Sequence, residues 1–227
     1  MGEQLAVQPP QISGRRRLDA VGWLDLAVKA LLLVLLVGAL LWPDLSGLKG
    51  KATTARLIIY PLGALAVPLW YWAYGRRRRE RYPWTADLLI TSPWLLDMVG
   101  NRFNLFDTVG WWDDAMHFVN WALLTAGVLI AFIPRDLSRG LYVLVALGFG
   151  ATAALCWELG EYVAFVRHSA ELQTAYTDTL GDLTLGTAGS LVAALIVYQI
   201  LHRRSIGGHA DHELRHAKPV DGPERAS

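Results

Sequence analysis

Residues 183–201 read LTLGTAGSLVAALIVYQIL and contain no charged side chain over 19 residues. Residues 115–133, AMHFVNWALLTAGVLIAFI, form a second run of 19 in which His117 is the only ionisable group. Residues 57–74 form a third uncharged run of 18. An α-helix needs about 20 mostly apolar residues to cross a bilayer core of about 30 Å. These three runs therefore predict membrane-spanning helices.

Two longer segments also predict spans, although each contains charged residues. Residues 141–166 begin with 17 uncharged residues and continue through Glu158 and Glu161. Residues 21–42 contain an acid and a base four positions apart, which share one helix face and can pair there. Both segments are long enough to cross the bilayer with some tilt.

The sixth candidate span, residues 84–99, is the weakest. It has 16 residues with a proline inside and an acid near either end, so it fits a short crossing or a re-entrant segment. The expected fold is an all-α polytopic membrane helix bundle of about six transmembrane helices. The expected organisation is a cytoplasmic N-terminal segment, a transmembrane helical domain and a disordered cytoplasmic tail without apolar periodicity, at residues 1–20, 21–201 and 202–227.

Composition excludes several classes of protein. Hydrophobic residues make up 53% and charged residues 18% of the 227 residues, which excludes a disordered chain. The formal net charge of +1 leaves no excess of positive charge for phosphates, which argues against a nucleic-acid partner. A single cysteine, Cys156, permits neither an internal disulfide nor a cysteine-rich metal cluster. The lipid bilayer is the one expected partner.

The distribution of Lys and Arg predicts the orientation. With the N-terminus inside, 15 of the 21 basic residues fall in inner segments and 5 in outer loops. Basic loops are retained on the cytoplasmic side. Both termini are therefore expected to be cytoplasmic.

In this orientation the ionisable residues of four spans gather in the outer half of the bundle. Asp113 and Asp114 precede His117 by four and three residues, so they can share one helix face with it. Glu158 and Glu161 are three residues apart on the next span. The full set is Asp97, Asp113, Asp114, His117, Glu158, Glu161, Asp178 and Asp182.

Small residues recur every four positions in line with these acids. The two series are Ala146, Gly150, Ala154 and Glu158 in one span, and Asp178, Asp182, Gly186, Ser190 and Ala194 in the next. Small residues at this interval let transmembrane helices approach closely, so they mark the face packed against other helices. The acids in the two series are therefore expected to point into the bundle.

Ionised carboxylates removed from water are costly unless they are protonated, paired with cations or bound to metal. Arg102 and Arg167 are the permanent counter-charges expected nearby. A divalent cation is the simplest way to neutralise the rest, because carboxylates and imidazole are its usual ligands and helix bundles supply them at this spacing. Shared protons or entering water are the alternatives. The expected metal ligands are Asp113, Asp114, His117, Glu158, Glu161, Asp178 and Asp182, with Asp97 as an additional candidate.

Structural interpretations compete with this hypothesis. The acids at positions 113 and 114, and those at 178 and 182, can simply cap the helices that they open. His117 can be a satisfied core histidine. Glu158 and Glu161 precede a helix end, where the macrodipole disfavours acids, so helix capping does not explain them.

Four stretches carry a resemblance to a known family. They are PWLLD at 93–97, WDDAMHF at 112–118, WELGE at 157–161 and TDTLGD at 177–182. Over residues 84–195 the chain resembles the YjdF-like bacterial inner-membrane proteins and, more loosely, VanZ-like membrane proteins. The resemblance implies a multi-pass helical fold in a bacterial inner membrane and a role for these positions. It assigns no substrate.

Three functions fit these observations. The first is an outward-facing site that binds a divalent cation or protons. The second is a membrane-embedded metal-dependent enzyme acting on a lipid or lipid-linked substrate, for which the sequence supplies no nucleophile motif and no assigned catalytic residue. The third is a scaffold in which the acids form a structural polar network. The first is preferred.

Overall fold

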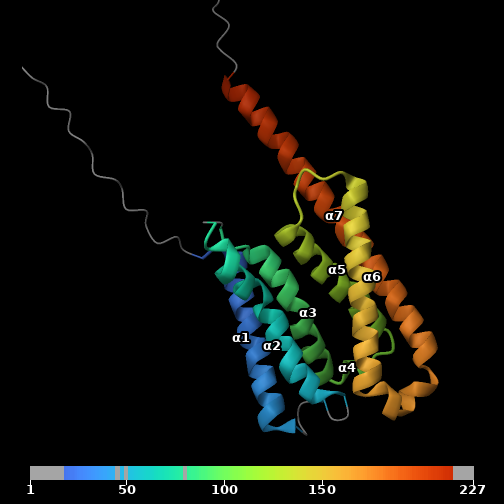
Figure 1. Cartoon of the computed structure of the whole chain (residues 1–227). Coiled ribbons are helices and arrows are strands. Elements are labelled where there is room, and N and C mark those ends of the chain that lie inside the picture. The colour runs from blue at the N-terminus through green and yellow to red at the C-terminus, as the bar shows by residue number, and fades with distance from the viewer. Residues whose placement is uncertain (1–17, 44–46, 49–50, 79–80, 217–227) are drawn as a thin grey trace, which may run out of the picture.

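Long helices run up and down the bundle in alternate directions (Figure 1). This computed structural model describes residues 18–43, 47–48, 51–78 and 81–216, with the backbone alone from residue 202 onward. The elements are α1 (Ala20–Leu41), α2 (Thr53–Trp70), the π-helical turn η2 (Tyr71–Gly75), α3 (Trp84–Arg102), α4 (Leu105–Thr108), α5 (Trp112–Phe132), α6 (Arg139–Ala164), the 3-10 turns η3 (Val166–His168) and η4 (Ala170–Gln173), and α7 (Ala175–His216).

Five of these helical segments are long and apolar enough to cross a membrane. They are Ala20–Leu41, Thr53–Gly75, Trp112–Phe132, Arg139–His168 and Ala175–Leu201. The regular elements of the described residues are all helical. The expected all-α polytopic membrane bundle is confirmed.

The sixth expected span, α3, is a continuous helix of 19 residues that passes through Pro93 without a break. At about 1.5 Å per residue it is about 28 Å long, close to the thickness of a bilayer core. It packs against α1, α2 and α5, and its polar residues Asp87, Thr91 and Asn101 are buried there. Because protein rather than lipid covers this helix, its weak apolar signal does not prevent it from spanning the bundle.

Close contacts of small residues hold α7 against α5 and α6. A Cβ atom added at Gly189 would collide with the carbonyl oxygen of Phe118, and one at Gly150 would collide with Ser190. Thr125 of α5 donates a hydrogen bond of 2.9 Å to Ser190. The predicted packing faces are therefore confirmed, because every member of the two small-residue series is buried except the exposed Asp178.

A buried ion-pair network joins α1 to α3 in the half of the bundle where α3 begins. The Lys29 ammonium lies 2.7 Å from both carboxylate oxygens of Asp25, which confirms the pairing expected within this span. It also lies 2.6 Å from Asp87 of α3, which accepts a hydrogen bond from the Tyr82 hydroxyl. We call Asp25, Lys29, Tyr82 and Asp87 the Lys29 cluster.

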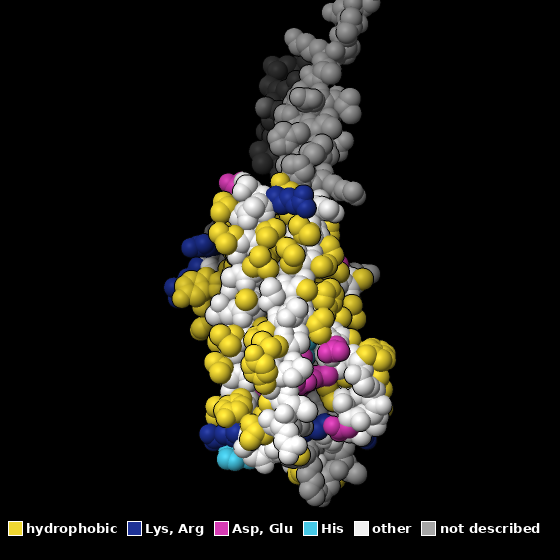
Figure 2. All heavy atoms as spheres, turned by 90° about the vertical axis from the view of Figure 1, so that its right-hand side faces the viewer, with side chains coloured by type: hydrophobic (Ala, Val, Ile, Leu, Met, Phe, Trp, Pro, Cys, Tyr) yellow, Lys and Arg dark blue, Asp and Glu magenta, His cyan; other side chains and the backbone are white. Residues whose placement is uncertain are grey.

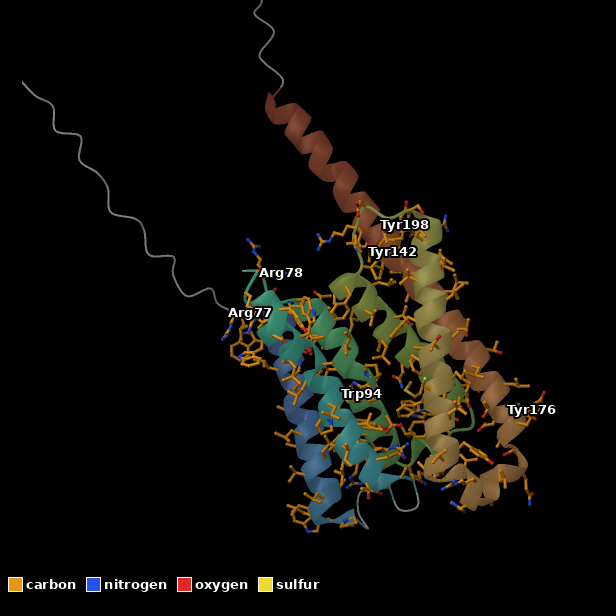
Figure 3. All side chains as sticks on the ribbon, in the orientation of Figure 1. Arg77, Arg78, Trp94, Tyr142, Tyr176 and Tyr198 are labelled. Atoms are coloured by element: carbon orange, nitrogen blue, oxygen red, sulfur yellow. The ribbon has the colours of Figure 1, made fainter. Side chains whose placement is uncertain are left out.

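Side chains also distinguish the two ends of the bundle. Tyr142 and Tyr198 meet at one end with ring centroids 5.7 Å apart, and Arg77 and Arg78 lie near that end as well (Figure 3). Tyr176 points outward near the other end (Figure 3). The connections α1–α2, α3–α5 and α6–α7 gather at the Tyr176 end, as a six-span arrangement requires (Figure 1).

The last helix continues into the C-terminal region. α7 continues as a helix to His216, whereas the sequence predicts a disordered tail from residue 202. Once a helix has formed, each further residue extends it at little cost, and no proline occurs between Pro134 and Pro219 to interrupt α7. The rest of the expected C-terminal tail, residues 217–227, and most of the expected N-terminal segment, residues 1–17, lie outside the described residues.

Candidate functional site

A cavity of about 320 Å³ lies among α2, α3, α5, α6 and α7, toward the end of the bundle where α3 finishes. Figure 2 shows acidic side chains in a hollow in the lower half of the face that it presents. The charged and ionisable residues that line the cavity are Lys51, Arg56, Asp97, Asp107, Asp113, His117, Glu158, Glu161, Asp178 and Asp182. Acids of five helices, α3 to α7, thus line one cavity.

His117 stands at the centre of these acids and is 9% exposed. Its Nε2 atom lies 3.6 Å from Asp113 Oδ1 and 3.6 Å from Asp182 Oδ1. Its Nδ1 atom lies 3.7 Å from Glu158 Oε1. The imidazole ring of α5 is therefore placed between carboxylates of α5, α6 and α7.

Two groups of side chains around this ring have the geometry of a metal site. One is Asp113, His117 and Asp182, and the other is His117, Glu158 and Glu161; in each, the potential ligand atoms lie within 4.8 Å of one another. Two ligands at about 2.0–2.3 Å from one ion are themselves about 3–4 Å apart. Small side-chain movements would bring either group onto an ion. We call these five residues the His117 cluster.

Two buried polar atoms of the His117 cluster accept or donate no hydrogen bond among the described residues. They are His117 Nδ1 and Glu158 Oε1, which face each other on one side of the ring. The second oxygen of Glu158 accepts a hydrogen bond of 3.2 Å from Thr179. A buried polar atom left unsatisfied costs about 1–3 kcal/mol, so these two atoms mark a place prepared for a ligand.

Asp97 belongs to a neighbouring network that is already satisfied. The Arg56 guanidinium donates to it at 3.1 Å, the Tyr60 hydroxyl at 2.5 Å and the Asn101 amide at 3.2 Å. Arg56 Nη2 also lies 3.8 Å from Glu161 Oε1. Asp97 is therefore held as the partner of Arg56, beside the His117 cluster rather than in it.

The structure corrects the prediction of which arginines supply the counter-charge near the site. Arg102 and Arg167 are both exposed, and the guanidinium that reaches the acids is that of Arg56, which is 7% exposed. Arg56 directly precedes the uncharged run 57–74 and is one of the five basic residues expected in outer loops, whereas α2 begins at Thr53 and includes it. The four-residue spacing of Arg56 and Tyr60 was the signal that could have placed both on one inward face.

The structure separates the eight candidate residues. It brings together Asp113, His117, Glu158, Glu161 and Asp182. Asp178 is exposed but still lines the cavity, whereas the exposed Asp114 lines a second hollow beside Asp178. Both lie in the first turn of their helices, where the capping interpretation continues to fit them.

Comparison with known proteins gives one match. A family model described as "Predicted membrane protein (DUF2238)" matches residues 27–204. No curated protein and no solved structure matches the chain. The match supports the expected membership of a membrane-protein family, while the resemblance to the YjdF-like and VanZ-like proteins stays a prediction.

Proposed function

Because this chain belongs to the family of membrane proteins described as DUF2238, we propose a function within the bilayer: the His117 cluster binds a divalent cation. The observation that carries the proposal is the pair of unsatisfied atoms, His117 Nδ1 and Glu158 Oε1, 3.7 Å apart in a buried position. An ion between them would satisfy both atoms. It would also offset the negative charge of the surrounding carboxylates.

The chemistry of a neutral imidazole allows only one ring nitrogen of His117 to bind the proposed ion. A neutral histidine has one nitrogen with a free lone pair, and its other nitrogen carries a proton. We place the ion on the Nδ1 side, where Glu158 and Glu161 complete the ligand set. The Nε2 proton then points toward Asp113 and Asp182, the outer contact that commonly orients a metal-bound histidine. Mixed imidazole and carboxylate ligands favour Mn²⁺, Zn²⁺ or Fe²⁺ over Ca²⁺.

The proposed orientation places this site near the external face of a bacterial inner membrane, with both termini in the cytoplasm. Its support is the distribution of basic residues, 15 inside and 5 outside. In a Cys156→Ala background, Leu105→Cys and Leu172→Cys should react with an impermeant thiol reagent added to whole cells, and Leu137→Cys should not. External labelling of Leu137→Cys would contradict the orientation.

A metal-dependent enzyme is the second candidate function. The cavity of about 320 Å³ holds more than an ion, since one water occupies about 30 Å³, and three protein ligands leave coordination positions open. The unsatisfied atoms His117 Nδ1 and Glu158 Oε1 support a bound ion but point to no particular substrate or reaction. Binding is therefore the function that the geometry supports best.

Metal content tests the proposal. Protein purified in detergent, incubated with Mn²⁺ or Zn²⁺ and desalted, should retain about one ion per chain, and Glu158→Gln and Glu161→Gln should each lower retention at least tenfold. Asp107→Asn is the matched control, because Asp107 lies at the mouth in an exposed pair with Lys51. Equal retention by Glu158→Gln and wild type would refute the site.

A further inference from the structure

The cavity continues past the His117 cluster into an apolar region, which we call the deep end. Trp121 and Leu124 follow His117 by four and seven residues, so they lie on its face of α5, about 6 and 10 Å further into the bundle. On α3, Pro93 and Trp94 line the same region, and Trp94 lies about midway along the bundle (Figure 3). Trp157 of α6 completes it, with its ring centroid 6.2 Å from that of Trp94.

The cavity has room for an organic ligand. Its volume of about 320 Å³ falls in the range of about 300–1,000 Å³ that is typical of small-molecule sites. An ion and its waters would fill only the part of the cavity that is lined by the acids and His117, which we call the polar level. Indole, proline and leucine side chains bound the deep end and favour an apolar group, and the Asn120 amide lines the cavity between this region and His117.

The charges of the polar level restrict the head group of such a ligand. Seven carboxylates line the cavity against two basic side chains. Lys51 is paired with Asp107, and Arg56 with Asp97, so both basic groups are already engaged. One divalent ion would still leave the remaining acids in excess. An anionic head group is therefore repelled, while a cationic one is attracted.

We propose that this cavity binds an amphiphile that has a positively charged ammonium head and an apolar chain. In chains without a bound ion the head lies among the carboxylates of the His117 cluster, where Glu158 is 9% exposed and its Oε1 atom accepts no hydrogen bond from the protein. The chain lies in the deep end against Trp121, Leu124 and Trp157. The inference uses the same cavity as the proposed cation site, but it does not require a bound metal ion.

Three ten-carbon probes test the head group. The full-length protein in nanodiscs of uncharged lipid is titrated with decylammonium, decanoate and decanol, and binding to empty nanodiscs is subtracted. Decylammonium should bind saturably at one site per chain, with decanoate at least tenfold weaker. Methylammonium should also be at least tenfold weaker, because it does not reach the deep end. Equal or tighter binding of decanoate, or equal binding of methylammonium, would overturn the proposal.

A substitution in the deep end tests the location. Leu124→Trp fills this region and should weaken decylammonium binding at least tenfold, whereas Leu144→Trp places the same side chain on the 65% exposed lipid-facing side of α6 and should have no effect. Both variants should retain Mn²⁺ as wild type does. If Leu124→Trp binds decylammonium normally, the ligand is not in this cavity. Decylammonium binding without Mn²⁺ retention would contradict the metal proposal alone, and the reverse result would contradict this inference alone.

Discussion

The Lys29 cluster and the His117 cluster lie in opposite halves of the same bundle, and both bury acids between helices, but they differ in how far those acids are satisfied. Asp25 and Asp87 are each 1% exposed, and both contact the Lys29 ammonium at 2.6–2.7 Å. The His117 cluster surrounds one imidazole with four carboxylates and leaves Glu158 Oε1 unpartnered.

This difference separates a structural lock from a binding site. In the Lys29 cluster the protein itself supplies the cation and the donors, so nothing further is needed. In the His117 cluster the acceptors are assembled without enough donors, and a cavity leads to them. Burial of charge alone does not indicate function, whereas buried polar atoms without partners beside a cavity are a reason to propose a ligand.

The largest effect is expected from removing the cation of the lock. Lys29→Met would leave two buried carboxylates without their counter-charge, so it should lower the free energy of unfolding by about 3–5 kcal/mol. Lys51→Met removes a partly exposed pair with Asp107 and should cost at most about 1 kcal/mol. Thermal unfolding in detergent measures both. Equal losses in the two variants would remove the distinction between a buried lock and a surface pair.

An intermediate effect on stability is expected when a divalent cation is added to the His117 cluster. Mn²⁺ at a hundredfold excess over its dissociation constant should stabilise the protein by about 2.7 kcal/mol, and chelation should reverse the gain. Glu158→Gln should abolish this response and should itself raise stability without metal, because it removes one of several repelling charges. The contrary result is that no cation stabilises the wild-type protein and that Glu158→Gln is destabilised under every condition. That result would indicate that the His117 cluster is a structural network like the Lys29 cluster.

The smallest effect concerns Tyr82, which precedes α3. Burial, followed by its hydrogen bond to Asp87, raises the pKa of Tyr82 above its ordinary value of 10.0. A raised folded-state pKa contributes stability that is fully present below the unfolded pKa and is lost as the pH rises beyond it. Stability should therefore fall above about pH 10, and Tyr82→Phe should flatten that fall. An unchanged alkaline slope in Tyr82→Phe would exclude Tyr82 from the lock.

Much of the fold was predictable because single helices encode it. The spans could be predicted from uncharged runs, and the buried faces of α6 and α7 could be predicted from small residues that recur every four positions. The same spacing aligned His117 with Asp113 and placed Glu158 on the inward face. These predictions depend only on helical periodicity, which local sequence contains.

The missed features depend on contacts between helices. Lys29 and Asp87 are far apart in the sequence, and helical periodicity relates residues of one helix only, so it does not show that they meet. Arg56 was counted with a loop because the start of α2 has no apolar signal. Asp114 and Asp178 are exposed, whereas the aspartates nearest to them, Asp113 and Asp182, are at least partly buried. The residue type is the same, so only the rotation of each helix in the bundle distinguishes them.

The most direct test of the cation site is the nitrogen coupling of bound Mn²⁺ in pulsed electron paramagnetic resonance. We expect a ¹⁴N modulation from one directly coordinated imidazole in the wild-type protein. His117→Gln should remove this modulation, and His168→Gln, which changes an exposed histidine, should preserve it. Bound Mn²⁺ without ¹⁴N coupling, or coupling that persists in His117→Gln, would contradict the claim that this cluster is a cation site built around His117.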